Sequence, residues 1–170
     1  FLSEEPDNLG FFKQAIAFLL TTRGIPQIYY GTEILMHGNK KESDGLVRLD
    51  FPGGFPEDKV NDFIAADRTP LQNEAFDFIQ KILKWRKGNE VISKGNMTHF
   101  MPINGIYLYQ RTIKDKRIIV IMNGNDTAKS IDMNRYKEIL KPGEGGIDII
   151  SGEPFICSPR MDFTPRALYI

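Results

Sequence analysis

The sequence has few of the residues that form disulfides and metal clusters. Its 170 residues include one cysteine, Cys157, one tryptophan, Trp85, and two histidines. A single cysteine excludes an intramolecular disulfide and a CxxC metal site. The 22 basic residues equal the 22 acidic ones, so the excess positive charge typical of nucleic-acid binding is lacking. The longest apolar run, residues 15–20, is far shorter than the ~20 residues that span a bilayer.

The composition that remains is globular. Hydrophobic residues make up 41% and charged residues 26% of the chain, unlike a disordered protein. The length suits one ordinary domain or two small ones. The chain starts at Phe1 without a methionine, which is typical of a mature form or of a piece of a larger protein.

Residues 8–23 predict a helix. Apolar side chains recur on one face every three or four residues: Phe12, Ala15, Ile16, Leu19 and Leu20. Asp7 or Asn8 can cap its start, and Gly24 can accept the left-handed conformation after its end.

Residues 25–31 predict a short strand buried on both faces, because β-branched and aromatic residues follow Pro26 without alternation. A long connection, residues 32–68, comes next. Within it only Lys59–Ala66 suggests a short helix. Its many apolar and aromatic residues favour an ordered loop that packs, and a connection of this length inside a compact domain is usually functional or disordered.

A second helix is predicted from Thr69 to Lys87. Thr69 is a good N-cap residue, Pro70 fits the first helical position, and Gln72 completes a capping box. Gly88 ends the helix.

The remainder of the chain predicts short strands separated by turns. The expected strands are 97–100, 105–111, 117–122, 130–133, 146–150 and 166–170. Close spacing of this kind favours an antiparallel sandwich or barrel. We therefore expect a domain boundary near residues 88–91.

The segment from Thr22 to Glu33 resembles the eighth barrel strand of the α-amylase family of glycoside hydrolases, family 13. The family's motif is G-x-P-x-x-Y-x-G-x-E, and its positions are filled here by Gly24, Pro26, Tyr29, Gly31 and Glu33. Glycine at the end of such a strand opens a loop on the face where α/β barrels place their chemistry.

The resemblance extends over the whole chain. The first predicted helix resembles the seventh barrel helix and the second resembles the eighth. Residues 48–54 are similar to the neopullulanase and cyclomaltodextrinase branch. The resemblance implies a mixed fold, α/β plus all-β. Residues 1–88 would be the last helix-strand-helix portion of a (β/α)8 TIM barrel, and residues 89–170 an antiparallel β-sandwich C-terminal domain.

The family cleaves α-glucosidic bonds with retention, using two carboxylates about 5 Å apart. In the family these follow the fourth and fifth barrel strands, and an Asn-His-Asp motif follows the seventh. None of these motifs is present here, and a whole barrel needs roughly 250 residues. We therefore assign no catalytic residue. The chain is expected to start just after the Asn-His-Asp stretch and to be inactive alone.

Asp44 and Arg48 match the family's Asp-x-x-x-Arg in the loop after strand eight, where the pair binds glucose hydroxyls. Carboxylates and guanidinium groups make charge-assisted hydrogen bonds to such hydroxyls. A local ion pair that only holds the loop is the alternative. For Glu33 the alternatives are a residue that orients the active site and a buried carboxylate satisfied by loop amides.

Other candidates have structural readings that we favour over functional ones. His37 could reach a substrate but is more simply a surface residue. Sugar stacking is the functional alternative to packing for the loop and strand aromatics. The residues in this group are His37, His99, Tyr29, Tyr30, Phe51, Phe55, Tyr107, Tyr109 and Cys157.

Two further functions compete with that of an enzyme fragment. One is a non-catalytic carbohydrate-binding or interaction module built on the β domain, and the other is an unrelated small α/β enzyme, for which no nucleophile, metal or phosphate motif is found. The expected partner is an α-glucan or maltooligosaccharide, with no nucleic acid, membrane or cofactor. Any calcium of the parent would bind upstream, and a periplasmic or secreted parent is favoured over a cytoplasmic one. Exposed barrel faces predict either self-association of the chain or disorder of the loop at residues 32–68.

Overall fold

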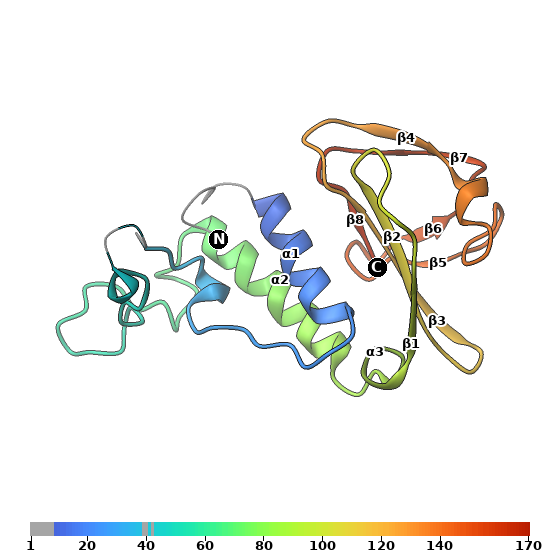
Figure 1. Ribbon diagram of the computed structural model, residues 1–170. Coiled ribbons are helices and arrows are strands. Elements are labelled where there is room, and N and C mark those ends of the chain that lie inside the picture. Colours follow the sequence, from blue (N-terminus) through green and yellow to red (C-terminus); the bar gives the residue numbers. More distant parts are fainter. Residues whose placement is uncertain (1–8, 39–40, 42) are drawn as a thin grey trace.

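The computed structural model describes residues 9–38, 41 and 43–170 (Figure 1). Its helices are α1 (Leu9–Thr21), α2 (Pro70–Arg86) and the short α3 (Glu90–Lys94), with 3-10 helices η1 (Thr32–Ile34), η2 (Asp44–Val47) and η3 (Met133–Tyr136). Its strands are β1 (Asn96–His99), β2 (Ile106–Ile113), β3 (Lys116–Asn123), β4 (Lys129–Asp132), β5 (Gly145–Ile147), β6 (Pro154–Ile156), β7 (Arg160–Phe163) and β8 (Leu168–Tyr169). Asp7 and Asn8, the expected caps of α1, lie outside the described residues.

The strands form one larger antiparallel sheet and two hairpin-like pairs. The larger sheet has the order β1-β2-β3-β8, while β4 pairs with β7 and β5 with β6. The tight β2–β3 hairpin turns at Lys114, whose φ of 53° lies in the left-handed region. This antiparallel, sheet-rich half agrees with the expected sandwich.

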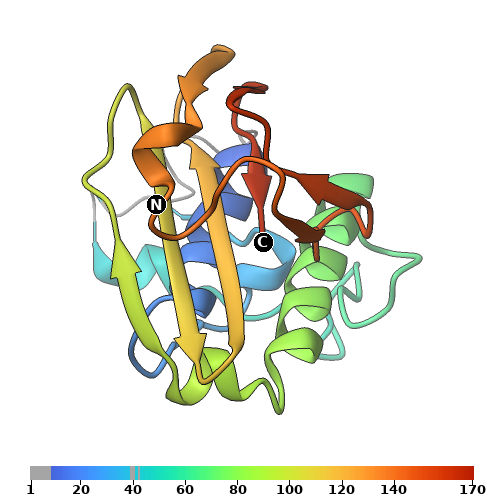
Figure 2. The ribbon, with the colours of Figure 1, turned by 90° about the vertical axis from the view of Figure 1, so that its right-hand side faces the viewer.

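Alternation along β2 and β3 divides the interior into two cores. Tyr109 and its partner Val120 face α1 and α2, with Ile16, Leu20, Phe78 and Ile82 among the buried residues of that core. Leu108 and its partner Ile121 face the opposite way, toward η3 and the β4–β7 pair. Figure 2 shows the sheet in front of the two helices, so one sheet face is covered by helices and the other by the smaller strand pairs.

Buried polar groups join α1 to the sheet. The Gln14 side chain donates hydrogen bonds to the carbonyls of Asn123 (2.8 Å) and Ala167 (2.9 Å). The buried Arg111 guanidinium on β2 donates to the carbonyls of Thr21 (2.9 Å) and Thr22 (3.0 Å) at the end of α1. The two Arg111 bonds satisfy carbonyls that the end of α1 leaves without partners in the helix.

The second helix confirms its expected start and end. The Thr69 hydroxyl accepts from the Gln72 N–H (3.2 Å), the Gln72 side chain accepts from the Thr69 N–H (2.7 Å), and Pro70 occupies the first turn. Gly88 follows the helix with a φ of 80°. The first helix is also confirmed, although it ends at Thr21, and Gly24 follows with a φ of 122°.

The buried strand predicted at residues 25–31 is wrong for this structure. The segment is irregular, and the exposed fractions of Ile25, Tyr29 and Tyr30 are 98%, 52% and 45%. A strand buried on both faces needs parallel neighbours to satisfy its backbone. None of the eight strands in the described part of the chain lies beside it.

The helix expected at Lys59–Ala66 is also wrong, because this segment forms turns. Asp58 and Asp67 accept hydrogen bonds from the backbone N–H groups of Gly53 (2.7 Å) and Asn61 (3.0 Å), so aspartates organise the loop. The expectation that its apolar residues pack is only partly met. The rings of Phe51 and Phe63 contact each other, although Phe63 is itself largely exposed. Further apolar side chains of the loop are also exposed: Leu46, Leu49, Phe55, Val60 and Ile64.

Four elements of the β-rich half are absent from the sequence prediction: α3, η3, β6 and β7. The strand β6 is three residues long and begins at Pro154, and β7 carries charged residues at two of its four positions. Neither has the apolar run that marks a strand.

No helix among the described residues has the length and apolar character needed to cross a membrane. The boundary at 88–91 stays a prediction, and the core facing α1 draws residues from both sides of it.

Candidate functional site

A small hollow lies where the segment 25–30 meets the loop that carries Asp44 and Arg48. It is lined by Tyr29, Tyr30, Thr32, Met36, His37, Val47 and Leu49. The Tyr30 hydroxyl donates to the Leu49 carbonyl (2.8 Å), which fixes the loop against the segment. The rings of Tyr29 and Tyr30 have centroids 4.5 Å apart. An aromatic pair beside polar groups provides a surface on which an amphipathic sugar ring can stack.

Asp44 and Arg48 stand at the two ends of η2, and neither is among the residues that line the hollow, although both sequence neighbours of Arg48 are. Asp44 opens the 3-10 helix, Arg48 is its C-cap residue, and both are exposed. The pKa of Tyr30 is raised, first by its hydrogen bond with Tyr29, and the nearby Arg48 guanidinium opposes that shift. The structure therefore brings Arg48 into the electrostatic neighbourhood of Tyr30. Sugar binding by Asp44 and Arg48 stays a prediction.

Glu33 lies in η1, one turn beyond Gly31. Gly31 has a φ of 79°, and its carbonyl accepts from the Met36 N–H (2.9 Å). A Cβ at Gly31 would collide with the Met36 side chain, so this turn requires glycine. Glu33 is half-buried and is not among the residues that line the hollow. Its role, orienting or structural, stays a prediction.

The remaining sequence candidates divide between the hollow and the β-rich half. His37 lines the hollow, and its Nδ1 lies 3.3 Å from the Leu35 carbonyl oxygen. His99 lies on the edge strand β1, with its Nδ1 3.3 Å from the Tyr107 hydroxyl. Tyr109 is fully buried beside Thr21, so it packs rather than forming a binding surface.

Two more candidates lie away from the hollow. Phe55 is 55% exposed, and its backbone N–H donates to Asp58 (3.0 Å). Cys157 is buried, and burial raises the pKa of its thiol. A raised pKa disfavours the reactive thiolate, as the sequence reading of this cysteine expected.

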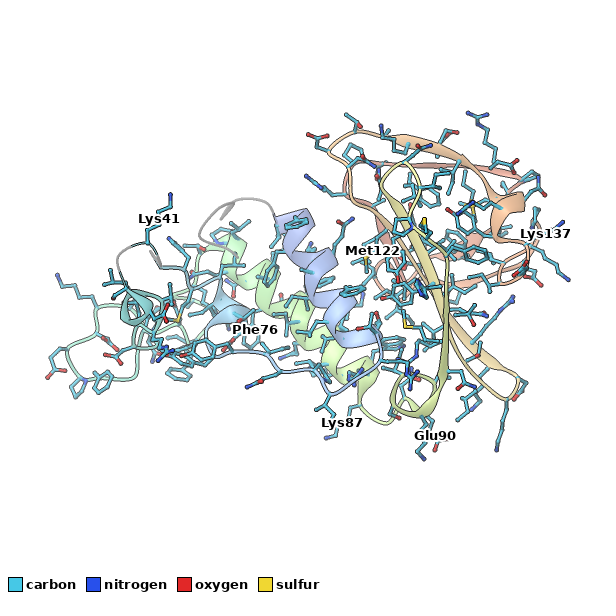
Figure 3. The ribbon with its side chains drawn as sticks, in the orientation of Figure 1. Lys41, Phe76, Lys87, Glu90, Met122 and Lys137 are labelled. Atoms are coloured by element: carbon cyan, nitrogen blue, oxygen red, sulfur yellow. The ribbon has the colours of Figure 1, made fainter. Side chains whose placement is uncertain are left out.

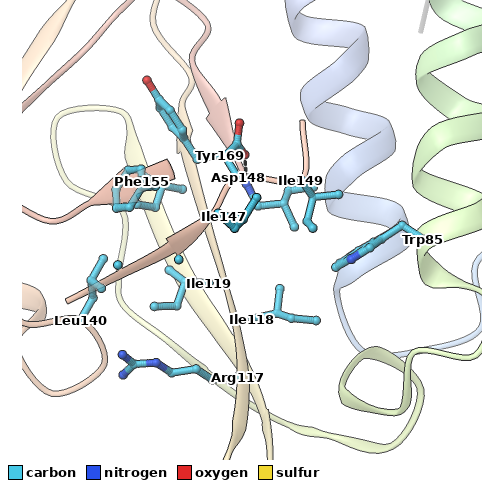
Figure 4. A pocket seen from close by; sticks show the side chains of 14 residues that line it. Trp85, Arg117, Ile118, Ile119, Leu140, Ile147, Asp148, Ile149, Phe155 and Tyr169 are labelled. Atoms are coloured by element: carbon cyan, nitrogen blue, oxygen red, sulfur yellow. Dashed lines mark hydrogen bonds between the residues drawn. The ribbon is translucent and has the colours of Figure 1, made fainter. Parts of the chain in front are cut away.

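The sequence reading missed a cavity in the β-rich half. This cavity of about 240 Å³ lies between β3 and the β5–β6 pair, and Trp85 of α2 closes one side (Figure 4). Its lining is mostly apolar and includes Ile118, Ile149 and Phe155. A second hollow adjoins it and shares Trp85, Arg117 and Ile118. The only signal in the sequence was the lone tryptophan near the end of a helix.

Within the described residues, no group of three or more His, Cys, Asp or Glu side chains could hold a metal ion. The expectation that the chain carries no cofactor stays a prediction.

The chain is similar in sequence to proteins named as α-amylases and cyclomaltodextrinases. Residues 97–170 match the family model of the cyclo-malto-dextrinase C-terminal domain. An α-amylase of Niallia circulans is 28% identical over 148 residues, which are 82% of this chain and 25% of that protein. A cyclomaltodextrinase of Thermoanaerobacter pseudethanolicus is 29% identical over 147 residues, 85% of this chain and 23% of that protein. The chain thus spans a quarter or less of the length of these relatives.

The fold gives the same result. The crystal structure of an α-amylase from Geobacillus thermoleovorans, complexed with acarbose, superposes with a TM-score of 0.71 at 19% identity. The superposition covers 98% of this chain and 34% of that one. These comparisons confirm that the chain is similar to the C-terminal part of α-amylase-family glycoside hydrolases (family 13), with a cyclo-malto-dextrinase C-terminal domain over residues 97–170.

Proposed function

We propose that this chain is the C-terminal part of a retaining α-glucan-cleaving enzyme that degrades starch, maltooligosaccharides or cyclodextrins. The observation that carries the proposal is the similarity of most of the chain to the C-terminal part of family 13 enzymes. The match covers a quarter or less of the two sequence relatives and 34% of the solved structure. The exposed apolar side chains of residues 25–64 support it. Ile25 at 98% exposure and Phe63 at 64% are residues that a larger protein would cover.

In this proposal residues 1–88 complete a (β/α)8 barrel and residues 89–170 form the C-terminal domain. Residues 25–30 become the eighth barrel strand once parallel neighbours supply hydrogen bonds on both sides. The helices α1 and α2 flank that strand and already pack on each other.

The two catalytic carboxylates would come from the rest of the parent, because retaining hydrolysis needs a nucleophile and an acid about 5 Å apart. Asp44 and Arg48 would bind hydroxyls of a glucose unit away from the cleaved bond, beside the Tyr29–Tyr30 pair. Contacts with remote sugar units lower the transition-state energy for long substrates only. Glu33 would orient this loop.

The test is a substitution in the full-length parent. Asp44→Ala should lower kcat/KM for maltoheptaose about tenfold, equivalent to ~1.4 kcal/mol, and change kcat/KM for a short aryl glucoside less than about twofold. Asp115→Ala, in the exposed β2–β3 turn, is the matched control and should change neither. Equal losses on both substrates would remove Asp44 from substrate binding. Hydrolysis of maltoheptaose by the 170-residue chain alone would contradict the proposed place of the carboxylates.

A further inference from the structure

We propose that the two adjoining hollows around Trp85 form a second α-glucan binding site, in the β-rich half and separate from the Asp44 loop. The class of ligand rests on the proposed function, whereas the place of the site rests on the structure. In the sequence the single tryptophan lies in the predicted helix 69–87 and not in the β domain, which disfavours a carbohydrate-binding module built on the β domain alone. The structure shows that this tryptophan lines both hollows.

The indole of Trp85 is anchored but not enclosed. It is half-buried and packs against the core facing α1. Figure 4 shows its ring directed from α2 toward the other residues that line the cavity. None of the hydrogen bonds found among the described residues uses its Nε1–H, and this nitrogen is not among the buried polar atoms without partners. An indole N–H can only donate, so it remains able to donate to a ligand hydroxyl.

The second hollow supplies polar groups on both sides of the ring. Lys87, Asn89 and Glu90 follow the end of α2, and Lys116 and Arg117 begin β3 across from them. Figure 3 shows Lys87 and Glu90 at the lower end of the molecule, where α2 gives way to α3. Asn89 uses its Oδ1 to cap α3, accepting from Val91 N–H (3.1 Å). That bond leaves the Asn89 amide N–H groups, which are donors, for other partners.

This combination of groups suits a sugar chain better than the other occupants. A glucose ring has apolar C–H faces and a rim of hydroxyls, which need an aromatic or aliphatic surface beside both donors and acceptors. The second hollow offers Trp85 and Ile118 as surface. Lys87 and Lys116 are its donors, because Arg117 already pairs with Glu144 (3.0 Å). Glu90 pairs with Lys94 (2.7 Å), and its exposed carboxylate has further acceptor positions for a hydroxyl. A purely apolar ligand would leave the polar half unused. The apolar cavity also contains a carboxylate, Asp148. Its oxygens already accept hydrogen bonds from Ser151 N–H (2.9 Å) and Ile170 N–H (3.0 Å), so the apolar cavity has no unpaired carboxylate for a ligand.

The two hollows around Trp85 are well separated from the Asp44 loop. Trp85 lies in the last turn of α2, and the loop joins the first turn of the same 17-residue helix. At 1.5 Å per residue, that helix is about 25 Å long. Figure 1 shows the described loop residues beyond the end of α2 that lies away from the sheet. One long glucan could contact both sites, but a short one could not.

Because Trp85 is the only tryptophan, its fluorescence reports directly on the site. Titrating the 170-residue chain with maltoheptaose should shift or quench that emission saturably, with a dissociation constant that isothermal titration calorimetry reproduces. Trp85→Ala should weaken binding at least tenfold by calorimetry. Trp85→Phe keeps a ring but loses the N–H, and should weaken binding two- to fivefold.

Since Trp85 also packs against a core, a second variant keeps the test independent of folding. Lys87→Ala combined with Lys116→Ala removes two exposed donors and should weaken binding about fivefold, with an unchanged circular dichroism spectrum. Lys137→Ala is the matched control, exposed after η3 and outside both hollows, and should bind normally.

Three results would overturn the assignment: no maltoheptaose response, unchanged affinity in both the tryptophan and the double lysine variants, or equal binding of the β-linked cellopentaose. Enhanced fluorescence of an apolar dye without any maltoheptaose response would assign the cavity to an apolar ligand instead. Failure of the proposed function gives a different result, because the Asp44→Ala variant of the full-length parent would then lose kcat/KM equally on maltoheptaose and on the short aryl glucoside. Binding by the chain alone does not depend on that outcome.

Discussion

The β-rich half and the described loop between Ile25 and Arg68 differ in how far their apolar side chains are exposed. In the β-rich half, Leu108, Tyr109, Val120 and Phe163 are fully buried. In the loop, Phe55, Phe63 and Ile64 are about half exposed or more, at 55%, 64% and 49%. Both regions have turns held by aspartate side chains, so the contrast does not arise from local turn chemistry.

The contrast arises from where each region finds its partners. β2 and β3 are joined by a hairpin and pair over eight positions with no contribution from distant chain. Residues 25–30 have the composition of a parallel strand, and parallel strands pair across long crossovers. Local pairing therefore completes the first region, whereas in the proposed function the second region would pair with strands of the full-length parent.

Among the polar side chains, the largest effect is expected at Arg111, which joins β2 to the end of α1. Its buried guanidinium donates to the carbonyls of Thr21, Thr22 and Gly95, the last at 2.8 Å. Arg111→Met leaves these carbonyls without donors, so the free energy of unfolding should fall by about 3 kcal/mol. Urea denaturation measures it.

Arg160→Met is the matched control, because Arg160 is exposed on β7 and bonds only a serine hydroxyl, Ser130 Oγ (2.7 Å). It should cost less than about 1 kcal/mol. Equal losses for the two variants would show that the carbonyls at the end of α1 are satisfied without Arg111.

A smaller effect is expected from pH at Tyr109. Burial is the main cause that raises the pKa of this phenol above its ordinary value, while its hydrogen bond with Thr21 acts the other way. The folded chain therefore holds the proton more tightly than the unfolded one. The stability linked to Tyr109 is fully present below pH 10 and is lost as pH rises beyond 10 toward the folded pKa, by about 1.4 kcal/mol at pH 11.

Tyr109→Phe removes this titration. Between pH 9 and 11 the free energy of unfolding of this variant should fall by ~1.4 kcal/mol less than that of the unsubstituted chain. Urea denaturation at several pH values checks it. Identical slopes for the two chains would mean that Tyr109 is open to water.

The sequence predicted those parts of the fold that local chemistry determines. The capping box of Thr69 and Gln72, the end at Gly88 and the β2–β3 hairpin depend on residues a few positions apart. The prediction failed at residues 25–31, whose composition is that of a buried strand but which pair with no strand in the described chain. It also failed at β6 and β7, which pair with β5 and β4 although their own sequences carry little strand signal.

The candidate sites divide in the same way. Sequence motifs pointed to Asp44, Arg48 and the glycine turn at Gly31. The structure places the first two at the ends of η2, and of these only Arg48 is next in sequence to residues that line the aromatic hollow. The Trp85 groove could not be read from the sequence, because its walls come from α2, β3 and the β5–β6 pair. Only tertiary structure brings these segments together.

The smallest effect on stability is expected in the loop, and it separates the two regions most directly. Phe55→Ser with Ile64→Ser should change the free energy of unfolding by less than about 0.5 kcal/mol, because both side chains are already half exposed. Ile82→Ser, at a fully buried position of α2, should cost at least ~3 kcal/mol. The same loop variant should weaken self-association of the chain about tenfold in sedimentation equilibrium, since it removes exposed apolar surface. If the unsubstituted chain is instead a monodisperse monomer with its loop amides protected from hydrogen exchange, then the exposed residues of 25–64 need no covering partner, and the loop is as self-sufficient as the sheet.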